Sequence, residues 1–350
     1  MALTNSVKEK ISIEVIKTLK SKFDNFPQDA SNNRNAPFHE AFLNAFSDKI
    51  GENVSNVPFF ISLSSWLHGL NTTLGQAFFE NVAHILCGGE KKEYTGGRGE
   101  DNILKMTASQ KHAVSDIITK LSNGNIIPDL ESENKQIFQN DNEKCVEPAM
   151  GFSADVFYED DNSVVAIELK TVKPNKGGMQ NEKQKILEGK AALYKKYPGK
   201  EIKFFIGFPF DPTVNTASEN MTSYNKSRFF HNIVGIDKFF DSKETLVASE
   251  LWDFLYGEEN TMEEILSIIN TISTTVFWDK FRLLTDGSKR NTQEYLDLLA
   301  EWNLFSEKEF LENKNNYTGR AQKAYNNSPF KADGKYDDNR YKILKEALWN

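Results

Sequence analysis

Apolar residues recur every three or four positions over much of the chain, which is the period of an amphipathic helix. The segment 7–23 shows this pattern clearly. Residues 71–87 show it most regularly, with capping residue types at 71–73 and Gly88-Gly89 after the last turn. Further helices are expected over 37–50, 107–122, 179–196, 244–256, 261–272, 292–303, 307–313 and 341–349.

The pattern changes to a strand-like one in the middle of the chain. Residues 152–158 alternate apolar and polar positions, and 163–172 are almost continuously apolar and β-branched, as in a central strand. A third strand is expected over 202–208 and a short edge strand over 232–240. With the helix 179–196 between the second and third strands, this predicts a β-β-α-β core flanked by helices.

We therefore expect one α/β core with helical additions at both ends. A helical N-terminal part covers residues 1–130, the core covers 131–243, and a helical C-terminal part with a basic, Asn-rich tail covers 244–350. Residues 89–103 are expected to form an exposed loop.

Composition narrows the class of protein. Apolar residues make up 39% of the 350 residues and aromatic residues 12%, which excludes a disordered chain. The formal charge of −8 argues against a generally basic nucleic-acid coat protein, although a locally basic cleft is compatible with it. Two cysteines cannot build a disulfide framework, and no signal peptide or membrane span is visible. We expect a soluble, cytoplasmic protein that does not enter a membrane.

The candidate chemistry lies on the two central strands. Asp155 is followed thirteen positions later by Glu168, and Lys170 stands two positions further on. Residues i and i+2 share one face of a strand, so Glu168 and Lys170 point the same way. A buried strand carries such charges when they are paired or functional. Two carboxylates with a main-chain carbonyl of Ile167 or Leu169 form an oxygen site suited to Mg²⁺.

Such a site can activate water and stabilise charge on a phosphoryl group. Lys170 would polarise the attacking water or hold a phosphate oxygen. The alternative is a surface hairpin with a Glu–Lys salt bridge, because E-x-K alone occurs by chance in most proteins of this size. The whole combination of Asp, gap, apolar strand and E-x-K favours a metal-dependent nuclease.

These residues resemble a known signature. Ala154-Asp155 with Glu168-Leu169-Lys170 resembles the PD-(D/E)xK nuclease motif, with Ala154 in place of Pro. More narrowly, the words AD, E-x-K and TVKPN in segment 154–178 resemble the TdeIII-like family of type II restriction endonucleases. Phrases at 37–40, 72–80 and 250–266 are similar too, so the resemblance spans roughly residues 35–270.

The resemblance implies a restriction-endonuclease-like α/β/α sandwich with a mixed central sheet and additional N- and C-terminal helices. Asp155, Glu168 and Lys170 would be catalytic, with Asp155 and Glu168 holding the metal. Glu80 would be a helix-borne carboxylate that reaches the site, unless it is a solvated helix residue.

The implied activity is Mg²⁺-dependent hydrolysis of double-stranded DNA at a short palindrome. The resemblance suggests a site of the GGNCC type, and a palindrome implies a homodimer. The alternatives are a repair or junction nuclease on the same fold and a catalytically silent DNA-binding protein.

A basic stretch supplies candidate DNA contacts. Residues 170–203 hold ten Lys against three Glu, a local charge of +7, which suits a phosphate backbone. The tail 313–345 holds eight Lys or Arg against three Asp, which predicts either a DNA clamp or disorder. Arg suits guanine and Asn suits adenine in the major groove. The expected DNA-binding residues are Lys173, Asn175, Lys176, Arg98, Asn225 and Arg228.

Overall fold

The chain folds into two compact units. The computed structural model describes residues 3–27, 43, 57–95, 102–139, 145–171, 176–215 and 217–349. The first unit contains Met1–Leu3 and Phe79–Ile265, and the second contains Thr4–Phe78 and Leu266–Asn350.

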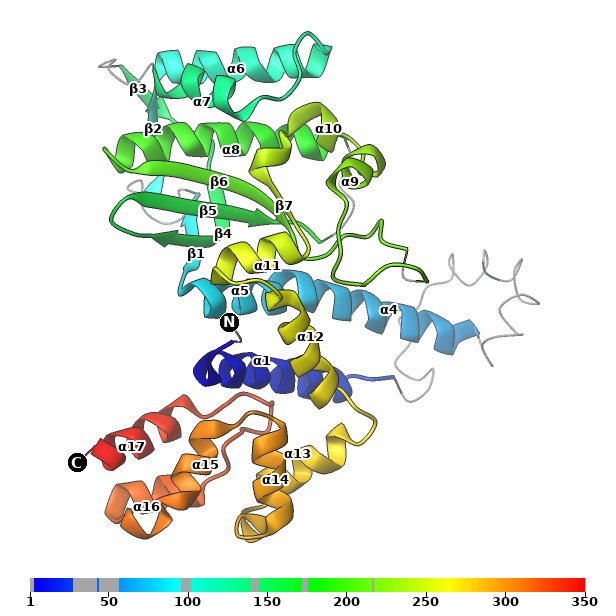
Figure 1. Cartoon of the computed structure of the whole chain (residues 1–350), viewed down its shortest axis with the longest axis vertical. Coiled ribbons are helices and arrows are strands. Elements are labelled where there is room, and N and C mark those ends of the chain that lie inside the picture. The colour runs from blue at the N-terminus through cyan, green and yellow to red at the C-terminus, as the bar shows by residue number, and fades with distance from the viewer. Residues whose placement is uncertain are drawn as a thin grey trace. The chain divides into compact units, whose positions relative to one another are not determined.

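A five-stranded mixed sheet organises the first unit, in the order β1-β4-β5-β6-β7 (Figure 1). Strands β1, β4 and β5 pair antiparallel, whereas β5, β6 and β7 pair parallel. Every residue of β5 is buried, as its continuous apolar sequence predicts for a central strand. The strands span Glu90–Tyr94 (β1), Phe152–Glu159 (β4), Ser163–Leu169 (β5), Glu201–Phe208 (β6) and Thr245–Val247 (β7).

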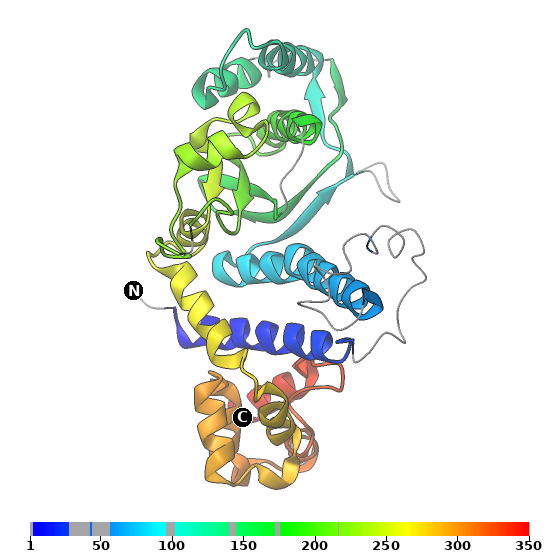
Figure 2. The same cartoon turned by 90° about the vertical axis from the view of Figure 1, so that its right-hand side faces the viewer.

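Helices cover both faces of this sheet. Figures 1 and 2 show α8 (Lys176–Lys196) on one face with α6 (Ala108–Asn123) and α7 (Leu130–Phe138) beyond it. On the other face lie α5 (Phe79–Cys87) and α11 (Ser249–Tyr256). The predicted α/β/α sandwich with a mixed central sheet is therefore confirmed.

Close packing of α8 on the sheet depends on Gly189. A Cβ atom at this position would lie 2.8 Å from the ring of Phe204 on β6. The glycine thus lets the helix backbone approach the strand.

Smaller elements complete the first unit. Strands β2 (Lys105–Thr107) and β3 (Val146–Pro148) form a separate antiparallel pair. The remaining elements are α9 (Lys226–Asn232), α10 (Ile236–Phe239) and the 3₁₀ helix η4 (Ser242–Glu244).

The second unit is helical among the residues described. Trp302 is fully buried and stacks on Phe277, with ring centroids 5.6 Å apart. The Glu9 carboxylate accepts hydrogen bonds from the Ser306 amide and hydroxyl at 2.8 and 2.7 Å. The elements are α1 (Asn5–Phe23), α4 (Val57–Thr73), the π-helix η2 (Leu74–Phe78), α13 (Phe277–Thr285), η5 (Gly287–Lys289), α14 (Gln293–Glu301), α15 (Phe305–Glu312), η6 (Lys314–Asn316), α16 (Gly319–Asn326) and α17 (Asp338–Trp349), while the residues of α12 (Thr261–Ile272) are divided between the units.

The expected edge strand over 232–240 is wrong. This region contains the end of α9 and all of α10, and the edge strand next to β6 is β7 instead. Buried side chains there recur every three or four positions, as a helix requires: Phe229, Ile233, Ile236, Phe239 and Phe240.

Two further expectations need correction. The helix expected at 71–87 begins at Val57, so the polar residues at 71–73 lie in the last turn of α4 and do not cap a helix start. Strand β1 lies within the loop expected over 89–103, where it pairs with β4. The helix expected over 37–50 lies outside the described residues, apart from Leu43.

The C-terminal tail is folded. It forms η6, α16 and α17, and it buries Tyr317 and Phe330. Arg340 makes a buried ion pair with Glu307 at 2.6 Å. Of the two alternatives for this tail, disorder is wrong and a DNA clamp stays a prediction. Within the described ranges, no helix is both long and apolar enough to cross a membrane.

Candidate active site

The antiparallel pairing of β4 with β5 brings Asp155 and Glu168 together. The register pairs Val156 with Ile167, so the next residues along the two strands are Asp155 and Glu168. Residues directly opposite each other place their side chains on the same face. The Leu169 amide donates a hydrogen bond to Asp155 Oδ2 at 2.9 Å, which fixes this carboxylate beside the E-x-K strand. Both acids are nearly buried, with Asp155 9% and Glu168 6% exposed.

A β-bulge places a lysine against Asp155. Two residues of β4, Asp155 and Val156, lie opposite the single residue Lys91 of β1. Bulges re-aim side chains and are frequent next to active sites. Lys91 Nζ lies 3.1 Å from Asp155 Oδ1 and 3.1 Å from Glu80 Oε2. Lys91 therefore connects the helix-borne Glu80 to Asp155.

Glu168 belongs to a second ion-pair network, which we call the active-site ring: Glu168, Lys170, Glu182 and Lys185. Lys170 Nζ lies 2.8 Å from Glu168 Oε1 and 2.9 Å from Glu182 Oε1. Lys185 Nζ lies 2.8 Å from Glu168 Oε1 and 2.6 Å from Glu182 Oε2. Cations and anions alternate around this ring, and α8 contributes two of its four members.

The pKa shifts follow from these contacts. Burial raises the pKa of Glu80. Burial works against the charged form of Lys91 and of Lys170, but the carboxylates that surround each ammonium outweigh it and raise both pKa values. Burial likewise opposes ionisation of Glu182, yet its two lysine partners lower the pKa. Lys91 and Lys170 are therefore protonated at neutral pH.

Helix α5 is tied to the same strand. His84 Nε2 lies 2.7 Å from the carbonyl oxygen of Asp155. A carbonyl can only accept, so Nε2 carries the proton and donates it. This bond holds α5, and with it Glu80, against the strand that carries Asp155.

The oxygen atoms of this site fit a divalent cation. Glu168 Oε2 is buried without a hydrogen-bond partner among the described residues, so it is an acceptor open to a further ligand. Over the part of the chain that the structure describes, no three His, Cys, Asp or Glu side chains are arranged to hold a metal ion. A cation held here would therefore depend on Asp155, Glu168, a main-chain carbonyl and water, which suits Mg²⁺ because it keeps several waters.

The expected DNA-binding residues are only partly described. Arg98, Lys173 and Asn175 lie outside the described residues, and Lys176 begins α8. Asn225 caps α9, where its side chain accepts a hydrogen bond from the Arg228 amide at 3.0 Å. The Arg228 guanidinium contacts Glu219 at 2.9 Å and Thr213 at 3.0 Å. In the structure these two side chains hold the segment between β6 and α9.

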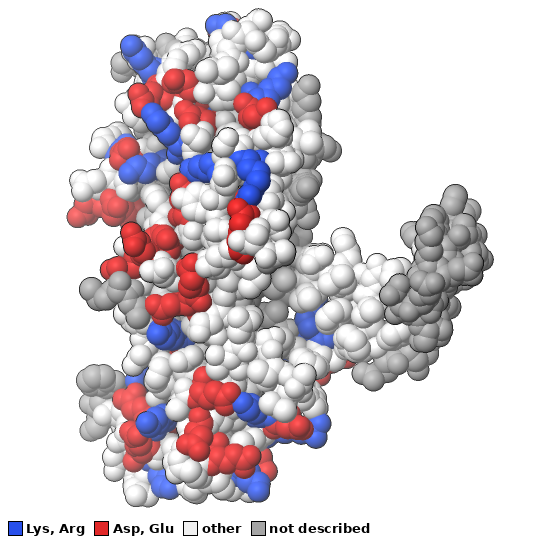
Figure 3. Space-filling model, turned by 45° about the vertical axis from the view of Figure 1, so that its right-hand side comes forward, with Lys and Arg blue, Asp and Glu red and all other residues white. Residues whose placement is uncertain are grey.

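The basic stretch 170–203 is less basic at the surface than its sequence suggests. Lys183 and Lys190 are 0% and 1% exposed, and both are paired with carboxylates. On the face drawn in Figure 3, Lys and Arg side chains lie among Asp and Glu side chains. Any basic DNA-binding surface therefore uses only part of this stretch.

Sequence reasoning missed Lys91, Glu182 and Lys185. Lys91 falls in a segment expected to be a loop, and the sequence does not show a bulge. Glu182 and Lys185 form an E-x-x-K pair on the helix that follows the E-x-K strand. That second pair is a signal that points to α8, because residues three apart share one face of a helix.

Comparison with known proteins identifies related sequences. Residues 3–273 match a family described as the type II restriction endonuclease HinfI. The chain is also 43% identical to the type II restriction enzyme MjaII of Methanocaldococcus jannaschii, over 99% of this chain and 98% of that protein.

Proposed function

Since this chain belongs to the HinfI family of type II restriction endonucleases, we propose that Asp155, Glu168 and Lys170 are the groups with which it cuts double-stranded DNA. Membership confirms the predicted class, so the protein is a site-specific deoxyribonuclease. The family that matches the chain is that of HinfI. The motif resemblance pointed to another family of type II restriction endonucleases, the TdeIII-like one.

The observation that supports this proposal is that Asp155 of β4 lies beside Glu168 and Lys170, which stand at the C-terminal end of β5 and just after it. Asp155 and Glu168 would hold Mg²⁺. A bound Mg²⁺ supplies a Lewis acid that lowers the pKa of a water ligand and offsets phosphoryl charge. The Leu169 amide keeps Asp155 in place, and the Lys170 ammonium is positioned to donate to the attacking water or to a phosphate oxygen.

Metal dependence is the first test. Wild-type protein should cleave plasmid DNA with Mg²⁺ and stop when EDTA is added. Ca²⁺ should support DNA binding without turnover, because it accepts a looser ligand shell and activates water poorly. Asp155→Asn should remove cleavage while leaving the protein folded. Cleavage that survives exhaustive chelation contradicts the metal mechanism. Wild-type protein that binds DNA but never cuts it would support the alternative of a catalytically silent DNA-binding protein.

We further propose a short palindromic target of the GGNCC type and a homodimer whose two-fold axis matches it. Digestion of a plasmid of known sequence, followed by run-off sequencing of the ends, identifies the target. Sedimentation of the protein with and without cognate duplex gives the oligomeric state. Cleavage at branched or damaged DNA instead of a fixed sequence would favour the repair-nuclease alternative.

The cytoplasmic location stays a prediction that rests on the two free cysteines, Cys87 and Cys145.

A further inference from the structure

Helix α8 presents two different charged faces. Glu182 and Lys185 belong to the active-site ring, whereas Lys183 and Lys190 belong to a second network. Successive helix residues turn by about 100°, so the second pair points roughly 120° away from the first. The helix therefore connects the site to a separate set of contacts.

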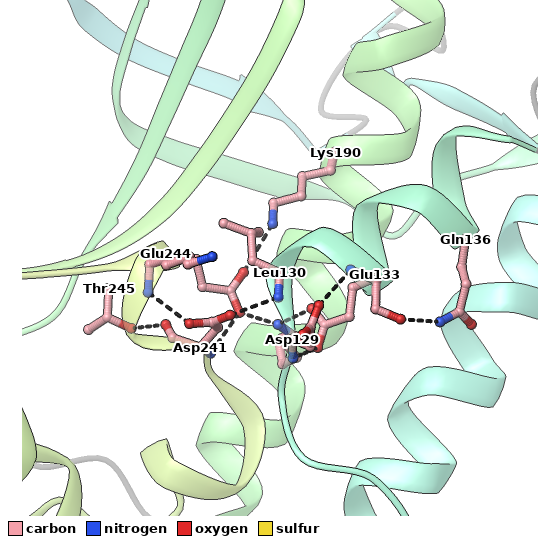
Figure 4. Close-up of polar contacts among 11 residues, drawn as sticks. Asp129, Leu130, Glu133, Gln136, Lys190, Asp241, Glu244 and Thr245 are labelled. Atoms are coloured by element: carbon pink, nitrogen blue, oxygen red, sulfur yellow. Dashed lines mark hydrogen bonds and ion pairs between the residues drawn. The ribbon is translucent and has the colours of Figure 1, made fainter.

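The second network is a buried cluster, which we call the buried anchor: Glu133, Lys183, Lys190 and Glu244. Lys183 pairs with Glu133 at 2.6 Å and also with Glu244, and Lys190 pairs with Glu244 at 3.0 Å. Figure 4 shows Glu244 between Lys190 and the end of α7 that carries Glu133. None of the four side chains is more than 2% exposed. A helix held in this way cannot rotate about its axis without separating buried charges.

The fixed rotation directs Glu182 and Lys185 at the catalytic strand. Glu168 Oε1 lies 2.8 Å from Lys170 Nζ and 2.8 Å from Lys185 Nζ. Two ammonium groups at one oxygen repel each other, and Glu182 offsets this repulsion because it contacts both of them. Without Glu182, Lys170 would keep Glu168 as its one carboxylate partner in the ring. Because the Lys170 side chain is 22% exposed, its ammonium would then be free to move.

We propose that Glu182 and Lys185 are positioning residues for DNA cleavage. Glu182 orients Lys170, and Lys185 orients Glu168. This inference rests on the proposed function, because it assigns to α8 the task of holding two catalytic residues in place. The protein itself would thus supply a helix-borne half of the site beside the strand-borne half.

Glu182→Gln tests this proposal in the full-length protein. The amide keeps the size of the side chain but loses the charge that holds both lysines. The single-turnover cleavage rate should fall by about 100-fold, the effect of a small misplacement of a catalytic group. The dissociation constant for cognate DNA, measured with Ca²⁺, should stay the same. A structural role alone would not separate the cleavage rate from DNA affinity in this way.

Glu188→Gln is the matched control. Glu188 is a buried carboxylate on the same helix, and it accepts hydrogen bonds from the Met150 amide at 2.6 Å and from Gln184 at 3.0 Å. It has no contact with the active-site ring among its hydrogen bonds in the described structure. This variant should cleave at the wild-type rate.

Substitutions of Lys185 test the same ring from its cationic side. Lys185→Met should slow cleavage as Glu182→Gln does, and Lys185→Arg should restore most of the rate because it keeps the charge. If Glu182→Gln does not fold, the Lys185 pair gives the answer alone. Wild-type rates in the folded Glu182→Gln or Lys185→Met variants overturn the proposal, and so does a loss explained by weaker DNA binding.

Asp155→Asn and Glu168→Gln, in the same assay, separate the two proposals. If both are inactive while Glu182→Gln is fully active, only the role of α8 is wrong. If either one cleaves at the wild-type rate with Mg²⁺, the assignment of the catalytic residues is wrong.

Discussion

The active-site ring and the buried anchor are built from the same components, yet water reaches them differently. Each contains two lysines and two glutamates, and α8 contributes two residues to each. Side chains of the ring are 8–22% exposed, whereas those of the anchor are 0–2% exposed. The surroundings of an ion pair, more than its chemistry, therefore decide whether it can act on a substrate.

Burial changes the energetics of the anchor. Burial lowers the pKa of Lys190 because it disfavours the charged ammonium. Burial alone would raise the pKa of Glu244, but Lys190 and Lys183 beside it hold the value at about 2. Removing one member of such a cluster leaves uncompensated charge away from water, which is costly. The ring can exchange a contact for water or substrate at lower cost, since it is partly solvated.

The largest expected effect is on catalysis. Glu168→Gln should reduce single-turnover cleavage by about 1000-fold or more, because it removes a charge that acts on the reacting groups. Urea unfolding should show a smaller loss of stability than removal of a charge from the buried anchor, since Lys170 and Lys185 keep Glu182 as a charged partner and the ring is partly solvated. A variant that cleaves normally but unfolds easily would reverse the comparison and assign the ring to stability.

The buried anchor should show the opposite result. Glu244→Gln should lower the free energy of unfolding by about 3–5 kcal/mol, because Lys183 and Lys190 both lose a charged partner. The fraction that remains folded should bind cognate DNA normally. Urea titrations measure the loss.

An exposed pair serves as the control for this variant. Glu131 is 80% exposed and pairs with Lys243 at 2.6 Å, so Glu131→Gln should leave the unfolding midpoint unchanged. Equal stability of the Glu244→Gln protein and the wild type would mean that the anchor does not stabilise the fold.

The pH dependence of stability sharpens the same point. The pKa of Glu244 in the folded protein, about 2, lies below its ordinary value of 4.5. A depressed pKa stabilises the folded state above pH 4.5, and this contribution is lost as the pH falls from 4.5 toward 2. Wild type should therefore lose more stability than Glu244→Gln over this interval in urea unfolding. Parallel curves for the two proteins would contradict this origin.

Sequence patterns predicted the strand-borne half of the site. The alternation along β4 and the apolar run of β5 placed Asp155, Glu168 and Lys170 on one hairpin, because strand periodicity fixes which residues share a face. Local periodicity carries this information within about fifteen residues of chain, so no long-range contact was needed.

The helix-borne half of the site was not predicted, because it depends on contacts between segments far apart in the sequence. Glu182 and Lys185 reach the site only because α8 packs on the sheet with one rotation. That rotation is held by Glu133 and Glu244, which lie 50 residues before and 54–61 residues after the lysines they bind. Similarly, the bulge that aligns Lys91 with Asp155 is a property of strand pairing. Long-range packing also buries Lys183 and Lys190, so counting charges along 170–203 overestimated the basic surface available to DNA.

The smallest expected effect concerns two lysines that follow β5 in sequence. Lys173 and Lys176 are expected to contact phosphates. The double variant with Ala should flatten the log–log salt dependence of DNA binding by about 2, because each phosphate contact contributes about 0.9 to the slope. The loss should be the same for cognate and random duplexes, since phosphates carry no sequence information.

The matched control replaces Lys200 and Lys203 with Ala. Both belong to the same basic stretch, but Lys200 donates to the Asp160 carbonyl and Lys203 pairs with Glu201 at 3.0 Å. This double variant should keep the wild-type slope. If both double variants keep it, Lys173 and Lys176 are solvated residues that do not contact DNA. A loss confined to cognate DNA would instead place one of them at a base edge, because only base contacts depend on sequence.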